Sequence, residues 1–300
     1  MKIRLSHTTM NSLFRCERLF QLTRLLEGER GRKTNENFCF GHAYEAGCVT
    51  YFLTGDKDRA LFDCYLAYHG LEDGYIAIPE TVKKNELTAC NLVIASFPKL
   101  DDLRDEWEVA TFDGKQAIQL SFRIDIDDVF YYVGYLDLAL KNKYTARHAV
   151  LDFKTTGLNL HVLDPLYMNS NQLIGYSVIL DAIVGKENAD YDVYYFVGQI
   201  TNTDGYGTRI SPLIFPKSLK DRLNFFITLG IDVKRIKEMM EMGIFPQRGE
   251  SCLKFNKPCS EFGTCGLHAL DTPKKEEPDE TEYQFTFKLD ELIQDHIERI

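Results

Sequence analysis

Apolar residues recur at helical spacing over the first hundred residues of the chain. The pattern predicts a first helix from about residue 10 to 26, which Thr8 or Thr9 can cap. A second helix carries apolar side chains at every fourth position, namely Phe40, Tyr44, Cys48 and Phe52. Two further helices are predicted over residues 57–70 and 83–97, the last ending near Pro98.

The pattern changes to that of β-strands at Trp107. Short apolar or alternating runs follow one another from there to residue 155: WEVATF, QAIQLSFRID, VFYYVGYLDLAL and HAVLDFKT. The turn signals Asp113-Gly114 and Asp127-Asp128 separate them, which predicts an antiparallel meander. A helix over about 164–183, strands at YDVYYFVGQI and RISPLIF, and a helix over 217–242 should follow. This order predicts an α/β fold, with a central mixed sheet flanked by helices.

Length and composition allow one elaborated domain. The 300 residues are 44% hydrophobic, which is enough for a substantial core. We expect one domain over residues 1–270 and an acidic tail over 271–300 that is partly disordered and ends in a short helix. No stretch approaches the roughly 20 apolar residues of a membrane span, and the N-terminus lacks the apolar block of a secretory signal. We therefore expect a cytoplasmic protein without a membrane partner.

The net charge of −10 argues at first against a nucleic-acid partner, because phosphate binding favours a basic surface. The charge is unevenly distributed, however. Residues 271–300 hold ten acids and four bases, whereas residues 1–33 hold eight bases and three acids. A second basic group lies in a predicted helix, and a solvated helix face is its simplest interpretation: Lys217, Lys220, Arg222, Lys234, Arg235 and Lys237.

Two strand-like runs deliver the candidate chemistry. Asp137 closes the apolar run VFYYVGYLD, and HAVLDFK ends in Asp152, Phe153 and Lys154. Residues i and i+2 share a face of a strand, so Asp152 and Lys154 should point the same way, and a hairpin could bring Asp137 beside them. Carboxylates that converge with an ammonium can hold a divalent cation while the lysine orients or deprotonates a water. The pattern predicts phosphodiester hydrolysis, and a structural ion-pair network is the alternative.

With these residues and the following helix, the chain resembles the PD-(D/E)XK nuclease superfamily, in particular its RecB-like exonuclease branch with phage and CRISPR-associated members. Gln172 and Tyr176, in QLIGY, resemble the branch's Q-x-x-x-Y motif, and the i, i+4 spacing places them on one helical face. The resemblance implies a restriction-endonuclease-like core. It also implies that Gln172 and Tyr176 bind a phosphate or position a metal-bound water.

The family also carries a histidine or acidic residue on an upstream helix, in the frame G-x-x-x-H/E. Here Gly41 is followed four positions later by Glu45, and His42 is the alternative. We favour Glu45 because a carboxylate is the better ligand for Mg²⁺ or Mn²⁺. The implied metal site then consists of Glu45, Asp137, Asp152 and the backbone carbonyl of Phe153.

Four cysteines complete the resemblance. Many members of the branch bind a [4Fe-4S] cluster through one N-terminal and three C-terminal cysteines, which Cys16, Cys252, Cys259 and Cys265 resemble here. The gaps of six and five residues depart from the family's closer C-terminal pair. Four thiolates hold either an iron–sulfur cluster or Zn²⁺, and the spacing does not choose between them.

The resemblance implies a metal-dependent DNA exonuclease that acts in recombination, repair or end processing. One alternative is a catalytically silent nucleic-acid-binding or assembly module. Another is a nuclease subunit that is active only with a helicase, recombination or single-strand-binding partner.

Overall fold

The computed structural model describes residues 2–26, 36–70, 83–186, 190–201, 208–254, 257–263, 265–266 and 281–300 of the chain. Its packing divides the chain into two compact units. We call residues 32–120 and 135–218 the α/β unit, and residues 1–31, 121–134 and 219–300 the terminal unit. The single domain expected over residues 1–270 stays a prediction.

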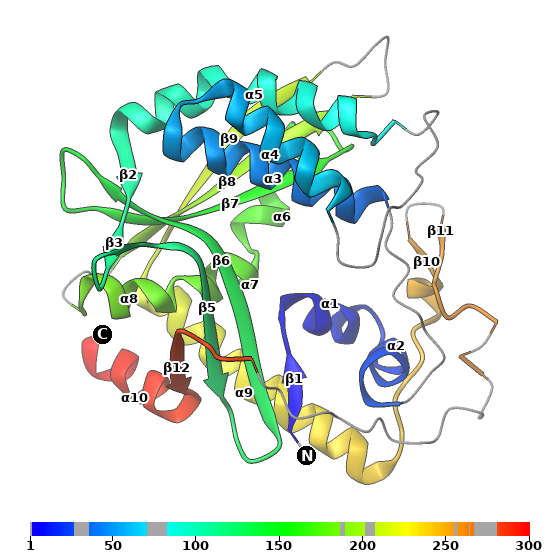
Figure 1. The fold of residues 1–300 in the computed structure, drawn as a ribbon. Helices are drawn as coiled ribbons and strands as arrows, with labels where there is room; N and C mark the ends of the chain where they lie inside the picture. The colour runs from blue at the N-terminus through cyan, green and yellow to red at the C-terminus, as the bar shows by residue number, and fades with distance from the viewer. Residues whose placement is uncertain are drawn as a thin grey trace. The chain divides into compact units, whose positions relative to one another are not determined.

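A mixed sheet forms the centre of the α/β unit (Figure 1). Its main strands, in order across the sheet, are β6 (Phe130–Asn142), β7 (His148–Thr156), β8 (Tyr191–Ile200) and β9 (Thr208–Lys217). Only the part of β6 from residue 135 on belongs to this unit. β6 and β7 are antiparallel, β7 and β8 are parallel, and β8 and β9 are antiparallel. The sheet and its flanking helices confirm the predicted α/β fold class.

Short strands complete this sheet region. β2 (Trp107–Val109) pairs antiparallel with the end of β6. β3 (Thr111–Phe112) and β4 (Lys115–Gln116) form a hairpin through Asp113 and Gly114, whose φ angles are 48° and 74°. Positive φ at both turn residues gives the turn a twist that matches the right-handed twist of the flanking strands. The hairpin turn lies where the sequence predicts it.

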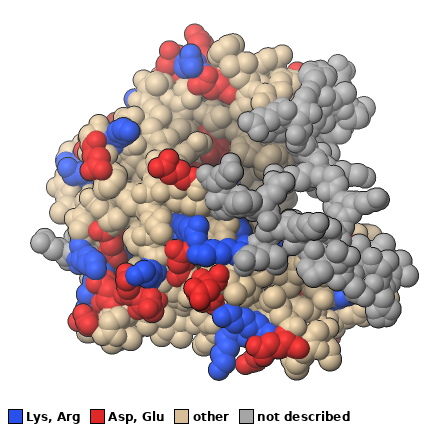
Figure 2. Space-filling view, turned by 60° about the horizontal axis from the view of Figure 1, so that its bottom comes forward, with Lys and Arg blue, Asp and Glu red and all other residues tan. Residues whose placement is uncertain are grey.

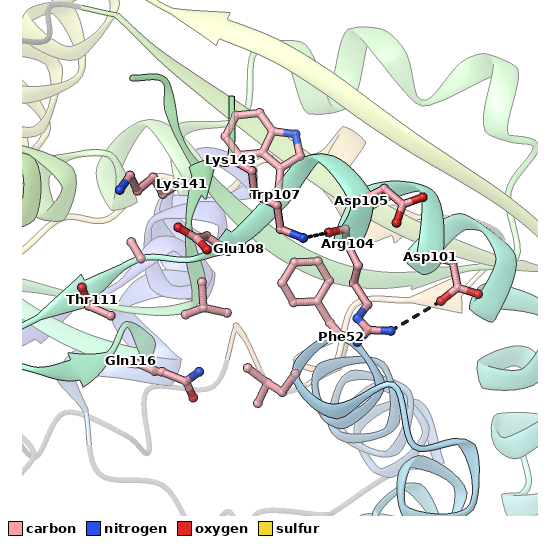
Figure 3. A pocket seen from close by; sticks show the side chains of 13 residues that line it. Phe52, Asp101, Arg104, Asp105, Trp107, Glu108, Thr111, Gln116, Lys141 and Lys143 are labelled. Atoms are coloured by element: carbon pink, nitrogen blue, oxygen red, sulfur yellow. Dashed lines mark hydrogen bonds and ion pairs between the residues drawn. The ribbon is translucent and has the colours of Figure 1, made fainter. Parts of the chain in front are cut away.

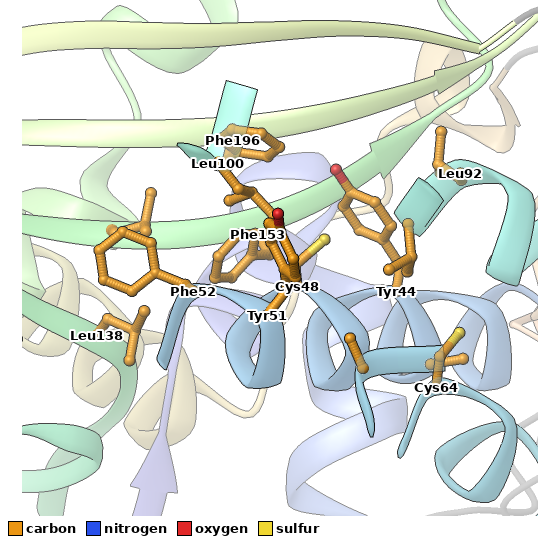
Figure 4. Close-up of a cluster of buried hydrophobic side chains, with 14 of the residues drawn as sticks. Tyr44, Cys48, Tyr51, Phe52, Cys64, Leu92, Leu100, Leu138, Phe153 and Phe196 are labelled. Atoms are coloured by element: carbon orange, nitrogen blue, oxygen red, sulfur yellow. The ribbon is translucent and has the colours of Figure 1, made fainter. Parts of the chain in front are cut away.

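One face of the sheet packs against the helices α3 (Glu36–Thr54) and α5 (Glu86–Glu106), and α4 (Lys57–His69) packs on these two helices (Figure 1). Figure 4 shows Tyr44, Cys48 and Phe52 of α3 directed at this core, together with Phe153 of β7 and Phe196 of β8. Because side chains alternate along a strand, burial of Phe153 in this core directs its neighbours Asp152 and Lys154 to the opposite face.

Gly198 in β8 lets the helices close on the sheet. A Cβ atom at this position would lie 2.9 Å from Cζ of Tyr44 and 2.7 Å from Cδ2 of Leu92. Both distances are shorter than ordinary van der Waals contact, so a larger residue would push α3 and α5 outward.

Two predicted helices differ from those observed. α5 does not end near Pro98 but continues to Glu106, because Phe97, Leu100 and Leu103 extend its buried face. The helix predicted over 164–183 is divided into α6 (Asp164–Met168), α7 (Asn171–Tyr176) and α8 (Val178–Val184). Ser170 causes the first division, since its hydroxyl accepts a hydrogen bond from the Gln172 backbone and starts a new helix.

The terminal unit begins with β1 (Ile3–Leu5), α1 (His7–Arg15) and α2 (Glu17–Phe20). Ser6 caps α1 in a capping box with Thr9, so the predicted cap at Thr8 or Thr9 is wrong. The single helix predicted over 10–26 is also wrong, because Cys16 is extended (φ −165°, ψ 122°) and separates α1 from α2.

The rest of the terminal unit contains the long helix α9 (Leu219–Met242), which packs against the C-terminal helix α10 (Leu289–Arg299). β12 (Phe285–Lys288) precedes α10 and pairs parallel with β5 (Ile118–Asp125). Of the expected acidic tail, residues 271–280 lie outside the described part of the chain. Residues 285–299 form a strand and the short terminal helix that the sequence predicts.

The second basic group is only in part a solvated helix face. Lys217 and Arg222 are buried, and Lys217 Nζ donates a hydrogen bond of 2.5 Å to the Met168 carbonyl. Arg235 pairs with Glu17, and Lys237 Nζ lies 2.6 Å from Asp127 Oδ2. On the face drawn in Figure 2, basic and acidic side chains likewise lie next to one another.

No helix in the described ranges is long and apolar enough to cross a bilayer.

Candidate active site

Asp137 and Asp152 come together where β6 and β7 stop pairing. The last pairs between these strands include Leu138 opposite Leu151, so Asp137 and Asp152 are the next positions along each strand. Instead of a backbone carbonyl, the carboxylate of Asp137 accepts the hydrogen bond from the Phe153 N–H, at 2.9 Å from Oδ2. The end of the ladder thus opens space for a side chain and holds that side chain in place.

Asp152 and Lys154 point to the same face of β7, as their spacing predicts. Lys154 Nζ lies 2.5 Å from Asp152 Oδ2, and the Asp152 side chain is almost fully buried. Lys154 keeps about a third of its side chain exposed, at 32%. The side chain is thus partly exposed, while its ammonium is anchored to the carboxylate.

The helix that follows β7 adds the two residues of the Q-x-x-x-Y motif. Gln172 Nε2 lies 3.2 Å from Asp152 Oδ1 and 2.8 Å from the Tyr176 hydroxyl oxygen, and donates to both. In this arrangement Gln172 orients Asp152, while Tyr176, which is buried, orients Gln172. The phosphate- or water-binding role that the resemblance implies for these two residues stays a prediction.

Glu45, on α3, interacts with the charges of Asp137, Asp152 and Lys154. Burial raises the pKa of Glu45, and the charge of Asp152 adds to that effect, whereas His42, Lys154 and a hydrogen bond from Gln119 lower it. His42 is exposed, and its ring packs edge-on against Phe38 at 4.4 Å. The geometry favours Glu45 over His42 as the upstream residue. Gln119 was not predicted from the sequence, where it is one polar residue in a strand pattern.

The electrostatics of this group are those of crowded carboxylates. Burial raises the pKa of Asp137 well above its usual range, and the charges of Asp152 and Glu45 raise it further. Burial also raises the pKa of Asp152, although Lys154 opposes this. Three acidic groups thus share one ammonium, which leaves an excess of negative charge when all are ionised.

Lys154 stays protonated in this environment. Burial alone would lower its pKa, but Asp152, Asp137 and Glu45 outweigh burial and raise it. The sequence-based possibility that Lys154 deprotonates a water required a lowered pKa. Without a bound cation the carboxylates favour the ammonium form, and the choice between orienting and deprotonating a water stays a prediction.

The two aspartates fit a hard divalent cation. Asp152 Oδ2 is buried and makes no well-aligned hydrogen bond within the described residues, despite the nearby ammonium. The N–H and C=O of one strand residue point to the same side, so the Phe153 carbonyl faces β6, as its N–H does. Mg²⁺ typically takes one or two carboxylates and keeps several waters, so this set is sufficient.

No group of three or more His, Cys, Asp or Glu side chains in the described ranges is arranged to hold a metal ion. The carboxylates of Glu45, Asp137 and Asp152 are therefore not arranged to coordinate one ion together. Its role as a direct ligand stays a prediction.

The four cysteines of the predicted cluster lie around one cavity in the terminal unit. The cavity has a volume of about 260 Å³, and Cys16, Cys252, Cys259 and Cys265 all line it. Burial raises the pKa of the Cys265 thiol, and the other three cysteines raise it further. The extended backbone at Cys16 interrupts the N-terminal helices at this point, and all four thiols are free. Their convergence agrees with a shared ligand, but the arrangement is not that of a formed metal site.

A larger polar cavity, of about 600 Å³, lies at the junction of α5 and β2 (Figure 3). None of the predicted site residues lines it. Its charged groups interact with one another: Arg104 Nη1 lies 3.6 Å from Asp101 Oδ1, and Lys143 Nζ donates to the Arg104 carbonyl at 2.5 Å. We assign no chemistry to this cavity.

The sequence matches no protein-family model and no curated protein. Among solved structures, the chain is similar to a candidate exonuclease from Eubacterium rectale, with a TM-score of 0.46 and 14% identity over 88% of this chain and 94% of that one. It is also similar to the protein SSO0001, with a TM-score of 0.29 and 16% identity over 69% of this chain and 77% of that one. Both TM-scores are below 0.5, so we base the function on the geometry of the site.

Proposed function

We propose that this chain is a metal-dependent deoxyribonuclease that hydrolyses phosphodiester bonds, and that it digests DNA from an end, as the resemblance implies. The observation that carries the proposal is the meeting of Asp137, Asp152 and Lys154 where β6 and β7 separate. Two carboxylates and an ammonium are groups that metal-assisted phosphodiester hydrolysis uses.

Asp137, Asp152 and the carbonyl of Phe153 would hold Mg²⁺ or Mn²⁺, with Glu45 as a further ligand or as a partner of a bound water. When bound, the cation supplies Lewis-acid activation of the attacking water and charge neutralisation at the phosphate. The excess of negative charge among the carboxylates supports this assignment, because a divalent cation offsets that charge.

The remaining residues orient and stabilise. Lys154, as an ammonium, would donate hydrogen bonds to the water or to a phosphate oxygen and stabilise the charge that develops there. Gln172 would keep Asp152 in its rotamer through the hydrogen bond to Oδ1, and Tyr176 would hold Gln172.

A cleavage assay tests the proposal directly. End-labelled single- and double-stranded DNA is incubated with Mg²⁺, with Mn²⁺ or with a chelator. We expect cleavage only with metal. Asp152→Asn should abolish detectable cleavage, and Lys154→Met should lower its rate by about 10²–10³-fold, as for loss of one charge-stabilising donor.

Asp192→Asn is the matched control, because Asp192 is a buried aspartate on the neighbouring strand that pairs with Arg147 and not with the site. This variant should retain cleavage. Wild-type rates in Asp152→Asn or Lys154→Met protein would overturn the assignment. DNA binding without cleavage would select the silent binding module, and cleavage that requires an added helicase or recombination protein would select the subunit alternative.

We further propose that the four cysteines bind a [4Fe-4S] cluster, or Zn²⁺ in its place, with a structural role. The shared cavity supports this, since one ligand there would join residue 16 to residues 252–265. Iron, sulfide and zinc analysis of anaerobically purified protein distinguishes the two. Protein without any of them would contradict both.

A further inference from the structure

Gln119 has a backbone conformation that its surroundings do not explain. Among the described residues, the non-glycine residues with positive φ are Asp113, at 48°, and Gln119, at 46°. Asp113 lies in the β3–β4 turn, where such a conformation is usual. Gln119 instead lies inside β5, where an L residue rarely adopts it.

The regular pattern of the strand is interrupted at this residue. Two positions earlier, just before β5, the Ala117 N–H donates to the Ala110 carbonyl at 2.8 Å, and the Ala117 carbonyl accepts from the Ala139 N–H at 3.0 Å. After Gln119 the alternation of buried and exposed positions is lost, and residues 120–122 are all buried. An irregularity of this kind changes the direction of one side chain, and such features are frequent beside active sites.

The side chain of Gln119 lies close to that of Glu45. It lowers the pKa of Glu45, as a hydrogen-bond donor would, and Glu45 in turn interacts with the charges of Asp152 and Lys154. Asp137 and Asp152 repel the ionised Glu45, whereas His42 and Lys154 attract it, so a neutral donor beside Glu45 helps to fix its orientation among these charges. A glutamine supplies that donor without adding charge.

We propose that Gln119 is a positioning residue, which holds Glu45 facing Asp152 and Lys154 so that Glu45 can bind the cation directly or through a water. This inference rests on the proposed function. Residues that orient the ligands of a metal commonly change its affinity by 10- to 100-fold when they are replaced. Loss of the Gln119 amide should therefore weaken metal binding and leave the fold intact.

Two substitutions separate the amide from the backbone. Gln119→Met keeps the length of the side chain and removes the donor, and Gln119→Gly removes the donor and tolerates the positive φ. Direct titration with Mn²⁺ alone, followed by the electron paramagnetic resonance of the free ion, should show affinity about tenfold lower in both variants. In cleavage assays, the Mg²⁺ concentration for half-maximal rate should rise by a similar factor.

Asp113→Gly is the matched control, since it replaces the other residue of positive φ and lies outside the site. It should bind Mn²⁺ as the wild-type protein does. In Glu45→Gln protein, adding Gln119→Met should cause little further loss, because both changes act through one carboxylate.

Asp152→Asn distinguishes failure of this inference from failure of the proposed function. If Asp152→Asn loses Mn²⁺ binding while both Gln119 variants keep wild-type affinity, the positioning role is refuted and the metal site stands. If Asp152→Asn itself keeps wild-type Mn²⁺ affinity, both the metal site and the role of Gln119 are refuted.

Discussion

Asp137 combines a structural and a chemical role in one side chain. Its carboxylate replaces a backbone carbonyl as the acceptor for Phe153 N–H, where the ladder between β6 and β7 ends. The same carboxylate is buried beside two other acids, which raise its pKa. The site thus holds a charge in a place that disfavours it, as is common where carboxylates bind metal.

Asp137→Asn should abolish cleavage and stabilise the metal-free protein. Asparagine keeps an oxygen acceptor for Phe153 N–H and removes the crowded charge. Because the folded pKa is raised, the ionised carboxylate destabilises the fold above the folded pKa, and this penalty is absent below the unfolded pKa of about 3.9. The variant should be more stable by about 1 kcal/mol at about pH 7, and this gain should vanish below about pH 3, where the carboxyl is protonated in both states.

Urea unfolding with a chelator present, at both pH values, measures this difference. A variant that is less stable than the wild-type protein near neutral pH would show that the charge is not under strain. A gain of equal size at both pH values would assign it to packing and not to ionisation.

Among the secondary-structure elements, helix ends depend on what each helix packs against. α5 continues past Pro98 because its next turns bury Leu100 and Leu103, and this burial outweighs the missing backbone donor of proline. The segment after β7 shows the reverse: Ser170 caps α7, and a helix predicted as continuous is divided. α7 then places Gln172 over Asp152.

Pro98→Ala should stabilise the α/β unit. Pro98 is exposed and lies inside α5, so alanine restores a backbone donor in the helix and removes the clash of the proline ring without losing buried surface. We expect a gain of about 1–2 kcal/mol in the free energy of unfolding, measured by chemical denaturation. Lys99→Ala, at the exposed neighbouring position, should change it by less than about 0.5 kcal/mol. A loss of stability in Pro98→Ala would mean that a bend at Pro98 is needed for α5 to pack.

At the scale of the whole molecule, the chain leaves the terminal unit and returns to it. Residues 1–31 and 219–300 belong to one compact unit, and the α/β unit is formed by segments between them. The cysteine cavity lies in the terminal unit and involves both distant segments, since Cys16 and Cys265 line it together. A ligand bound there would connect α2 to the segment after α9.

Cys252→Ser should therefore loosen the N-terminal helices if the cysteines bind a cluster or zinc. We expect loss of the bound metal and faster hydrogen exchange at the amides of α1 and α2, with no change at the amides of β7. Cys90→Ser is the control, because Cys90 lies in α5, with its sulfur 3.8 Å from that of Cys64. It should keep both the metal content and the exchange pattern. Equal exchange in α1 and α2 of the Cys252→Ser and wild-type proteins would contradict a structural cluster.

Periodicity along the chain predicts most of this fold. The predicted runs from Trp107 to residue 155 and the turn at Asp113-Gly114 correspond to observed strands and a hairpin, and the apolar spacing of Tyr44 and Cys48 corresponds to α3. These features follow from local backbone geometry, which a short window of sequence contains. The i, i+2 spacing of Asp152 and Lys154 is local in the same sense, and the two side chains do meet.

Three-dimensional packing decided the rest, because it brings together residues that are distant in sequence. Long-range contacts decide where β6 and β7 separate. They also bring Glu45 of α3 close to Asp152, and Gln119 of β5 close to Glu45. The raised pKa of Lys154 is a further case, since it reflects three carboxylates from three separate elements. Local sequence specifies which groups are available, whereas their charge state and mutual orientation follow from the burial and the neighbours that folding supplies.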